Sequence, residues 1–302
     1  MMLSVVVPCY NEEGNVALFY KEAMEAFKRS NMSFEFVFVN DGSTDSTLSV
    51  LKKLCSGPVP MKIVNFSRNF GKEAAMMAGL EASKGDYVVV IDADLQQKPE
   101  LVLDMLGTLE GDESVDCVAA FQESRGESKP LAFFKKSFYK LINKMSDTQF
   151  FQGASDFRCM RRRMVDAVIG MKEYHRFSKG LFSWVGFNTV YMPYTAAPRA
   201  AGDSKWSFRK LFRYAVDGIE SFSTAPLRLP LYLGVLFLAL SVILFVILIF
   251  AAKEFIDIAV MFFVGGTVLF CMGIMGEYLA KAYVQGKGRP VYIVKEIIDN
   301  EK

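Results

Sequence analysis

Apolar residues follow two different spacings in the first 121 positions of the chain. Short runs rich in Val, Ile and Phe predict buried β-strands over residues 3–7, 34–39, 61–66, 87–91 and 115–121. Between them, apolar residues recur every three to four positions over residues 16–27 and 72–82, a spacing typical of amphipathic helices. Strands and helices that alternate in this way predict an α/β domain with a mostly parallel sheet.

Two apolar segments near the C-terminus have the length of membrane spans. Residues 229–252 form a run of 24 residues without a charge, and residues 258–276 are also uncharged. A helix of that length covers roughly 36 Å, against about 30 Å for the hydrocarbon core of a bilayer. Because only a short polar link separates the segments, we expect a hairpin of transmembrane helices over residues 229–252 and 258–282, ahead of two buried helices of a soluble bundle.

Basic residues flank this hairpin on both sides. They are Arg209, Lys210, Arg213 and Arg228 before it, and Lys281, Lys287, Arg289 and Lys295 around and after its end. The positive-inside rule places both flanks, and hence both termini, in the cytoplasm. The first apolar run stops at Pro8 and has no basic region before it, unlike a signal peptide. We expect an inner or plasma membrane protein with a cytosolic domain over residues 1–204 and a cytosolic tail over residues 283–302.

Two basic segments with interleaved aromatic residues indicate contact with the bilayer surface. Residues 129–145 contain five lysines and no acid, and their spacing predicts an interfacial amphipathic helix. A basic helix packed on the protein's own core is the alternative. Residues 205–228 predict a juxtamembrane segment that leads into the first span. Near an anionic leaflet, such segments would hold the cytosolic domain at the membrane.

Composition excludes several kinds of site. A formal net charge of +2 gives no bulk attraction to nucleic acid, and we expect no nucleic-acid partner. His175 is the single histidine, which rules out a multi-histidine metal site and leaves one candidate base for a Ser/His/Asp triad. The five cysteines lie far apart without a CxxC pair, so neither a disulfide framework nor a structural zinc site is expected.

Acids cluster after the predicted strands, at the edge where open α/β sheets bind ligands. Ser43 and Asp45 follow the second strand, where helix capping is an equal alternative. Asp92 and Asp94 follow the fourth strand, and two carboxylates this close require a nearby cation. Oxygen ligands without His or Cys suit Mg²⁺ or Mn²⁺, which joins carboxylates to phosphate oxygens. Because the chain has no GxxxxGK[ST] loop and no GxGxxG after a strand, other residues would hold the expected diphosphate.

Six sequence blocks resemble, in order, those of the family-two inverting glycosyltransferases of the GT-A fold, and among them the polyprenyl-phosphate glycosyltransferases that include the dolichol-phosphate mannose synthases. The blocks are VPCYNEE at 7–13, NDGSTD at 40–45, SRNFGKEAAMMAGL at 67–80, DADLQQKPE at 92–100, SDFRCM at 155–160 and RAAGDSKW at 199–206. The resemblance implies a Rossmann-like GT-A domain with a mostly parallel sheet, followed by a membrane hairpin of two helices.

The same resemblance assigns a donor site. A nucleotide-sugar would bind Pro8, Tyr10, Asn11, Glu12, Asp41, Ser43, Lys72, Asp92, Ala93 and Asp94. Asp92, Asp94 and Gln96 would hold Mg²⁺ or Mn²⁺ on its diphosphate. Sugar transfer develops negative charge on the departing nucleoside diphosphate, and a bound cation stabilises that charge. Loss of Asp94 is therefore expected to lower turnover most.

The acceptor implied by the resemblance is a lipid phosphate, which is anionic near neutral pH and needs no strong base. Asp156 is the candidate base or orienting residue, and an ion pair with Arg158 or a nearby arginine is an equal alternative. Candidates for binding phosphates are Arg125, Arg199, Ser204 and Lys205. Gln122 stands where many relatives carry arginine. We expect His175 to have a structural or acceptor-contact role rather than a catalytic one.

These features lead to one favoured function and several alternatives. The favoured hypothesis is inverting transfer of a hexose, glucose first, from a UDP-sugar to polyprenyl phosphate at the cytoplasmic face, with undecaprenyl phosphate as the bacterial acceptor. A GDP-sugar donor, as in a GDP-mannose-dependent mannosyltransferase, is the second choice. A polysaccharide synthase would need more spans and a QxxRW block. A non-catalytic nucleotide-sugar-binding scaffold would not need the acids. Relatives suggest a homo-oligomer such as a tetramer.

Overall fold

The computed structural model describes residues 1–28, 30, 32–122, 143, 151, 154–174, 176–195, 197, 230, 232–234, 236–237, 239–240, 243 and 256–300. The chain divides into two compact units. Unit 1 comprises Met1–Tyr139, Gln149–Ser207 and Pro290–Lys302, and unit 2 comprises Lys140–Thr148 and Phe208–Arg289. The predicted interfacial helix at 129–145, apart from Asn143, and the juxtamembrane segment at 205–228 lie outside the described residues.

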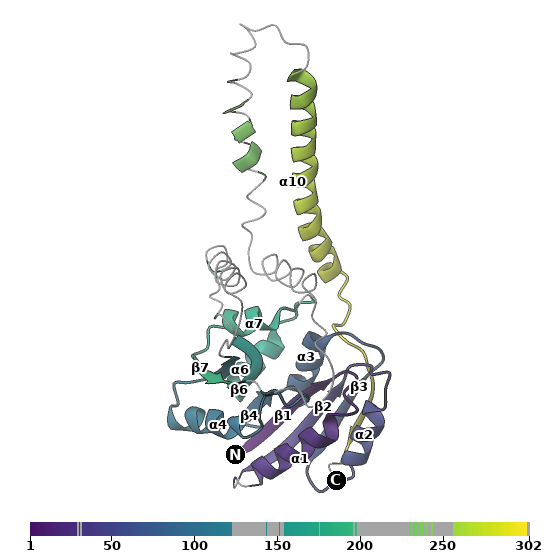
Figure 1. Ribbon diagram of the computed structural model, residues 1–302, viewed down its shortest axis with the longest axis vertical. Coiled ribbons are helices and arrows are strands. Elements are labelled where there is room, and N and C mark those ends of the chain that lie inside the picture. The colour runs from purple at the N-terminus through teal and green to yellow at the C-terminus, as the bar shows by residue number, and fades with distance from the viewer. Residues whose placement is uncertain are drawn as a thin grey trace. The chain divides into compact units, whose positions relative to one another are not determined.

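Unit 1 is built on an eight-stranded sheet with the order β7-β5-β6-β4-β1-β2-β3-β8 (Figure 1). The strands are β1 Met2–Cys9, β2 Ser33–Asn40, β3 Met61–Phe66, β4 Tyr87–Val90, β5 Cys117–Gln122, β6 Ala154–Arg161, β7 Thr189–Tyr194 and β8 Val294–Asp299. β4, β1, β2 and β3 run parallel, as do β5 and β7, whereas β6 and β8 are antiparallel to their neighbours. The prediction of a mostly parallel α/β sheet is confirmed, and β1–β5 correspond to the five predicted strands.

Helices cover both faces of this sheet. They are α1 Val16–Phe27, α2 Thr47–Leu54, α3 Lys72–Ala82, α4 Leu101–Gly111, α6 Arg162–Gly170 and α7 Ser178–Trp184. Side chains alternate between the faces along each strand, so Val5 packs with α1, α2 and α4 while Val6 packs with α3, α6 and α7. Gly79 lets α3 approach β1, since an added Cβ would lie 2.2 Å from Val6 Cγ1. The central strands are therefore buried on both faces, which explains their uninterrupted apolar sequences.

The C-terminal residues form part of this sheet. Residues 283–302 were expected to be a cytosolic tail, and the structure places Val294–Asp299 antiparallel to β3 as β8. The ring of Tyr292 stacks on Phe66 with centroids 4.8 Å apart. Alternate β8 side chains are half-buried, in a pattern that a six-residue strand shows only weakly in sequence. The polypeptide thus returns to the α/β domain after the second apolar segment.

Unit 2 contains one long described helix, α10 Ile256–Gly286 (Figure 1). Its segment Phe263–Gly286 is long and apolar enough to cross a membrane, and no part of it is buried against the described chain. Large apolar side chains such as Leu269 and Phe270 are exposed. The predicted second span at 258–282 lies within this helix. Most of the predicted first span at 229–252 lies outside the described residues.

Candidate active site

The parallel strands of unit 1 create a topological switch point between β1 and β4. The chain runs outward from β1 through β2 to β3 and then returns to β4 on the other side of β1. Ligands of open α/β sheets bind outside the carboxyl ends of the strands at such a point. The loops after β1, β2 and β4 carry most of the predicted donor residues, and the topology brings these loops to one edge of the sheet.

Four predicted donor residues lie at the end of β1 or in the loop after it, and Asn11 is one of them. Pro8 is half-buried in the strand opposite Val39 of β2. Tyr10 is exposed, and Glu12 accepts a hydrogen bond of 2.7 Å from the side chain of Asn15. An exposed aromatic ring beside a polar loop can stack on a flat ligand such as a nucleobase.

Side-chain hydrogen bonds join the loop after β1 to the loop after β2. Asn11 has a left-handed φ of 53°, and its backbone N–H donates to Ser43 Oγ over 3.0 Å. The Asn11 side-chain oxygen accepts from the backbone N–H of Thr44 at 2.9 Å. Asp45 instead accepts from the backbone N–H of Thr47 at 3.0 Å, close to the capping role considered for it. Asn11 and Ser43 therefore fix two of the loops to each other.

Asp41 organises the segment that leads into α3. Its buried carboxylate accepts from the backbone N–H groups of Phe70 at 2.7 Å and Gly71 at 3.0 Å. Burial raises the pKa of Asp41, although these hydrogen bonds and Arg68 favour the ionised form. At Gly42, with φ of 62°, an added Cβ would lie 2.2 Å from the backbone carbon of Arg68. The NDG sequence thus fixes the start of α3.

Lys72, the first residue of α3, links acids from two different strands. Its Nζ lies 2.7 and 2.9 Å from the two carboxylate oxygens of Asp92, and 3.2 Å from Oδ2 of Asp156. Burial acts to lower the pKa of Lys72, but attraction to Asp92 and Asp156 outweighs it and raises the pKa, so the ammonium stays charged. The sequence gives no sign of this bridge, because its three members are far apart along the chain.

Asp156 is an ionised acid with one unused oxygen. Burial acts to raise its pKa, but the cations Lys72, Lys179 and Arg158 together lower it. Oδ1 of Asp156 is buried and has no hydrogen-bond partner among the described residues. The structure pairs Asp156 with Lys72, whereas the Arg158 guanidinium lies 3.8 Å over the ring of Phe182. An unpartnered buried anionic oxygen is costly unless a ligand or cation completes it.

The loop after β4 presents its polar residues on one side. Asp92, Asp94 and Gln96 are partly exposed, while Ala93 and Leu95 are buried. Leu95 has a left-handed φ of 59°, a conformation that is uncommon for a residue with a Cβ. Asp94 Oδ1 accepts from the backbone N–H of Gln96 at 3.1 Å. The turn therefore leaves both acids partly exposed while it buries Ala93 and Leu95.

These acids fit a divalent cation that takes its remaining ligands from a diphosphate. The described residues contain no group of three His, Cys, Asp or Glu side chains placed to hold a metal by themselves. Mg²⁺ commonly takes one or two protein carboxylates together with phosphate oxygens and water. Asp92 and Asp94 therefore suit Mg²⁺ or Mn²⁺ that binds with its diphosphate, more than a metal held by the protein alone.

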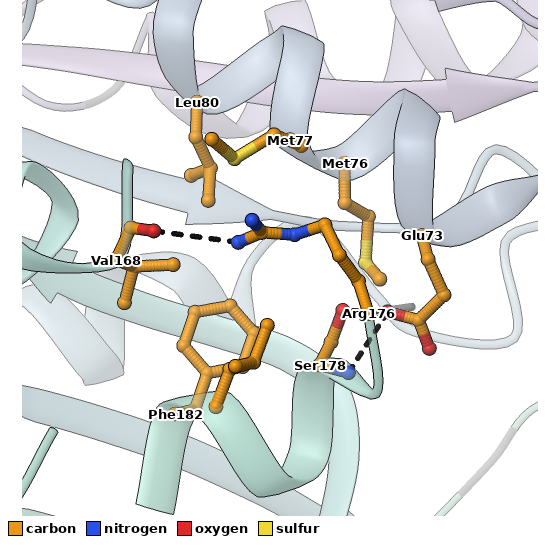
Figure 2. A pocket seen from close by; sticks show the side chains of 9 residues that line it. Glu73, Met76, Met77, Leu80, Val168, Arg176, Ser178 and Phe182 are labelled. Carbon is orange, nitrogen blue, oxygen red and sulfur yellow. Dashed lines mark hydrogen bonds between the residues drawn. The ribbon is translucent and has the colours of Figure 1, made fainter. Parts of the chain in front are cut away.

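Glu73, next to Lys72, is a second feature that the sequence did not reveal. Its carboxylate accepts from the backbone N–H of Ser178 at 2.9 Å and from the Ser178 hydroxyl, joining α3 to α7 (Figure 2). Burial and the nearby charge of Asp156 raise the pKa of Glu73 to about 8. The Arg176 guanidinium points away from this carboxylate and donates to the carbonyl of Val168 at 3.3 Å (Figure 2). It also donates to the carbonyl of Met171 at 2.7 Å. The acid in the sequence GKEAA, at the start of a predicted helix, was the signal that could have pointed to Glu73.

The predicted phosphate-binding residues fall outside the described part of the chain. They are Arg125, Arg199, Ser204 and Lys205. His175 also lies outside the described residues. The described segment after β7 ends at the loop of acids, where the backbone N–H of Ala197 donates to the Gln96 carbonyl at 3.1 Å. Gln122 is exposed at the end of β5.

Comparison with known proteins identifies both parts of the chain. Residues 4–169 match the model of Glycosyl transferase family 2, and residues 225–282 match the GtrB C-terminal hairpin. A Bacillus subtilis (strain 168) protein described as a glycosyltransferase, CsbB, is 39% identical over 304 residues, covering 98% of this chain and 92% of the relative. The bactoprenol glucosyl transferase of Shigella phage SfV is 36% identical over 319 residues, covering 100% and 99%.

Among solved structures, mannosyl-3-phosphoglycerate synthase from Rubrobacter xylanophilus is similar, with a TM-score of 0.49 at 20% identity; the alignment covers 72% of this chain and 71% of that one.

The family-two model spans more than half of the chain, and the hairpin model spans both predicted membrane segments. The resemblance noted in the sequence is therefore confirmed. The chain belongs to glycosyl transferase family 2 and is a glycosyltransferase with a GtrB-type C-terminal hairpin.

Proposed function

We propose that the protein transfers glucose from UDP-glucose to polyprenyl phosphate, with undecaprenyl phosphate as the bacterial acceptor. The observation that carries this proposal is the bridge from Lys72 to Asp92 and Asp156, next to Asp94 in the same loop as Asp92, in a chain that also matches the GtrB C-terminal hairpin. Support for the substrates comes from the bactoprenol glucosyl transferase, whose similarity extends over the whole chain. A non-catalytic scaffold would have no need for such acids.

The donor would occupy the switch point between β1 and β4. Tyr10 and the loop joined by Asn11 and Ser43 would bind the nucleoside, with Pro8, Glu12 and Asp41 shaping that pocket. Lys72 would contact the diphosphate beside Asp92, Ala93 and Asp94. Asp92, Asp94 and Gln96 would hold Mg²⁺ or Mn²⁺, and the cation would supply stabilisation of the charge that develops on the departing UDP.

The acceptor phosphate would approach from the side of Asp156. A phosphate oxygen attacks C1 of glucose on the face opposite to UDP, so that a C1–O bond forms as the bond to the UDP oxygen breaks and the configuration inverts. Asp156 would orient this acceptor rather than deprotonate it, because the lipid phosphate is already ionised. Arg125, Arg199, Ser204 and Lys205 would bind phosphate oxygens through charge-assisted hydrogen bonds.

The membrane placement follows from the acceptor. Two spans would anchor the enzyme in the inner membrane, with the catalytic domain and both termini in the cytoplasm. The isoprenoid tail can then stay in lipid while its phosphate reaches the site. We expect a homo-oligomer, such as a tetramer, in the bilayer.

An assay with purified full-length protein in detergent tests the proposal. With UDP-[¹⁴C]glucose, undecaprenyl phosphate and Mg²⁺ or Mn²⁺, label should enter the organic phase. Asp94→Asn removes a cation ligand and should lower turnover at least about 100-fold, the scale of losing one electrostatic stabiliser. Asp104→Asn, an equal change at an exposed acid of α4, should retain the wild-type rate. Wild-type turnover in Asp94→Asn would refute the metal site.

A further inference from the structure

Lys72 occupies the space between two acids that the proposed reaction uses for different substrates. Asp92, at the end of β4, belongs to the donor side, and Asp156, on β6, belongs to the acceptor side. The ammonium contacts both, at 2.7 and 2.9 Å from the oxygens of Asp92 and 3.2 Å from Asp156. A protein cation thus lies against Asp92, one of the carboxylates proposed to hold the metal.

The contact is accessible from solvent. The side chain of Lys72 is 41% exposed and that of Asp92 is 29% exposed. Because solvent reaches this pair, a divalent ion that arrives with a diphosphate can compete with the ammonium for Asp92. A lysine suits such an exchange, since its charge sits at the end of a flexible four-carbon stem.

The backbone at Lys72 is held on both sides, which confines any movement to the side chain. Before it, the N–H groups of Phe70 and Gly71 donate to the buried carboxylate of Asp41. After it, Glu73 accepts from Ser178 of α7. The helix start therefore cannot follow the ammonium, and the stem of Lys72 must swing away from Asp92 toward the nearest new anion.

We propose that Lys72 is an internal counter-cation that keeps Asp92 from binding a metal until the donor diphosphate arrives and draws the ammonium away. This inference rests on the proposed function and extends it. Free enzyme binds the metal weakly because Lys72 competes for Asp92. A nucleoside diphosphate supplies the anion that takes over Lys72, so metal and nucleotide bind cooperatively. Lys72 is in this sense a positioning residue that couples donor binding to the exposure of the acids.

Mn²⁺ binding without turnover tests this inference. Free Mn²⁺ is measured by electron paramagnetic resonance over purified full-length protein, with and without UDP, after subtraction of Mn²⁺ bound to UDP alone. In the wild type, UDP should tighten Mn²⁺ binding at least tenfold. Lys72→Met should bind Mn²⁺ at least tenfold more tightly than the wild type without UDP. UDP should tighten Mn²⁺ binding by a smaller factor in this variant than in the wild type, because only the ligands from the diphosphate remain to be gained. Lys72→Gln is a second neutral variant in case the first does not fold.

Two control variants separate local competition from net charge. Lys72→Arg keeps a cation beside Asp92 and should stay within threefold of the wild type without UDP. Lys53→Met makes the same charge change at an exposed position of α2 and should not alter Mn²⁺ binding. If folded Lys72→Met and Lys72→Gln bind Mn²⁺ no more tightly than the wild type, the inference is wrong while the proposed function stands. If the wild type binds no Mn²⁺ even with UDP, the proposed metal site itself is wrong.

Discussion

Adjacent residues at the start of α3 have opposite surroundings. Lys72 points to Asp92 and Asp156 and remains charged, whereas Glu73 points to Ser178 and its pKa rises to about 8. A helix turns successive side chains by about 100°, so neighbours in sequence meet different elements. One short sequence block thereby connects the acids of the sheet to α7.

Glu73 should make stability depend on pH. Its ordinary pKa of 4.5 applies to the unfolded chain, and its folded value is about 8. The folded state therefore holds a proton that the unfolded state releases between these values, and stability is lost as pH rises from about 4.5 to 8. Glu73→Gln stays neutral and keeps an acceptor for Ser178. Its stability relative to the wild type should rise across this window, by up to about 1.4 kcal/mol per pH unit.

Thermal unfolding in detergent at pH 5, 6.5 and 8 measures this difference. The exposed Glu110→Gln on α4 is the control and should show no such trend. A constant offset between Glu73→Gln and the wild type at all three pH values would contradict the assigned protonation of Glu73.

At the scale of elements, β8 contributes polar contacts that reach the end of β2, next to Asp41. Asn40, which precedes Asp41, donates from its amide to Asn65 at 2.8 Å, and Asn65 donates to Glu296 of β8 at 3.0 Å. Asn40, Asn65 and Glu296 are register partners across β2, β3 and β8. Lys52 then pairs with Glu296 at 3.2 Å on the surface. The C-terminal strand thus supports the segment that holds α3.

Asn65→Ala should destabilise unit 1 more than Lys52→Ala does. The first change leaves the buried amide of Asn40 unpaired, which costs about 1–3 kcal/mol. The second removes an exposed ion pair, worth less than about 1 kcal/mol. Thermal unfolding of both variants compares the two costs. Equal stability of the two variants would show that the buried hydrogen bonds to β8 contribute no more to stability than the exposed ion pair does.

Gly79→Ala should disturb the site through α3. An added Cβ would lie 2.2 Å from Val6 Cγ1, so the helix must shift away from β1 and carry Lys72 with it. Gly107→Ala in α4 meets no atom within 4 Å and should be neutral or stabilising by up to about 1 kcal/mol. We expect Gly79→Ala to lower both the melting temperature and the transfer rate. Wild-type behaviour of this variant would contradict the close packing of α3 on β1.

The sequence predicted the strands that are continuous apolar runs and missed those in which polar or half-buried residues are interspersed. β1–β5 are apolar runs bounded by polar loops, whereas β6 contains Asp156 and Arg158, and β8 alternates half-buried with exposed residues. Whether such segments form strands depends on pairing with neighbouring strands that are far away in the sequence. Asp92 and Asp94 were likewise predicted to act together, because two carboxylates this close in sequence repel each other unless a cation lies near them. Their link to Lys72 and the contact of Glu73 with Ser178 depend on tertiary structure.

At the scale of the whole molecule, the proposed membrane hairpin would determine which acceptor the enzyme can reach. α10 carries exposed apolar side chains along most of its length, and the family model of the hairpin covers residues 225–282. A cytosolic donor and a lipid acceptor meet only if the catalytic domain lies at the inner surface. The proposed reaction therefore requires the catalytic domain to lie on the cytoplasmic side. The basic residues that flank the hairpin predict the same orientation.

Cysteine labelling tests the orientation. In a Cys271→Ala background, the remaining native cysteines are buried in unit 1. A cysteine replacing Asp257, at the start of α10, should react with an impermeant maleimide on intact cells. A cysteine replacing the exposed Lys287, past its end, should react only after permeabilisation. The reverse pattern, or labelling of both positions from one side, would contradict a two-span hairpin with cytoplasmic termini.

The most direct test of the central claim is the identity of the sugar that enters the lipid phase. Purified enzyme with undecaprenyl phosphate and Mg²⁺ or Mn²⁺ is given labelled UDP-glucose, UDP-N-acetylglucosamine or GDP-mannose in parallel, and the initial rate of transfer to lipid is measured for each. We predict the highest rate from UDP-glucose, dependent on the divalent cation and absent in Asp94→Asn. Faster transfer from GDP-mannose, or no lipid-linked label from any donor, would contradict a polyprenyl-phosphate glucosyltransferase.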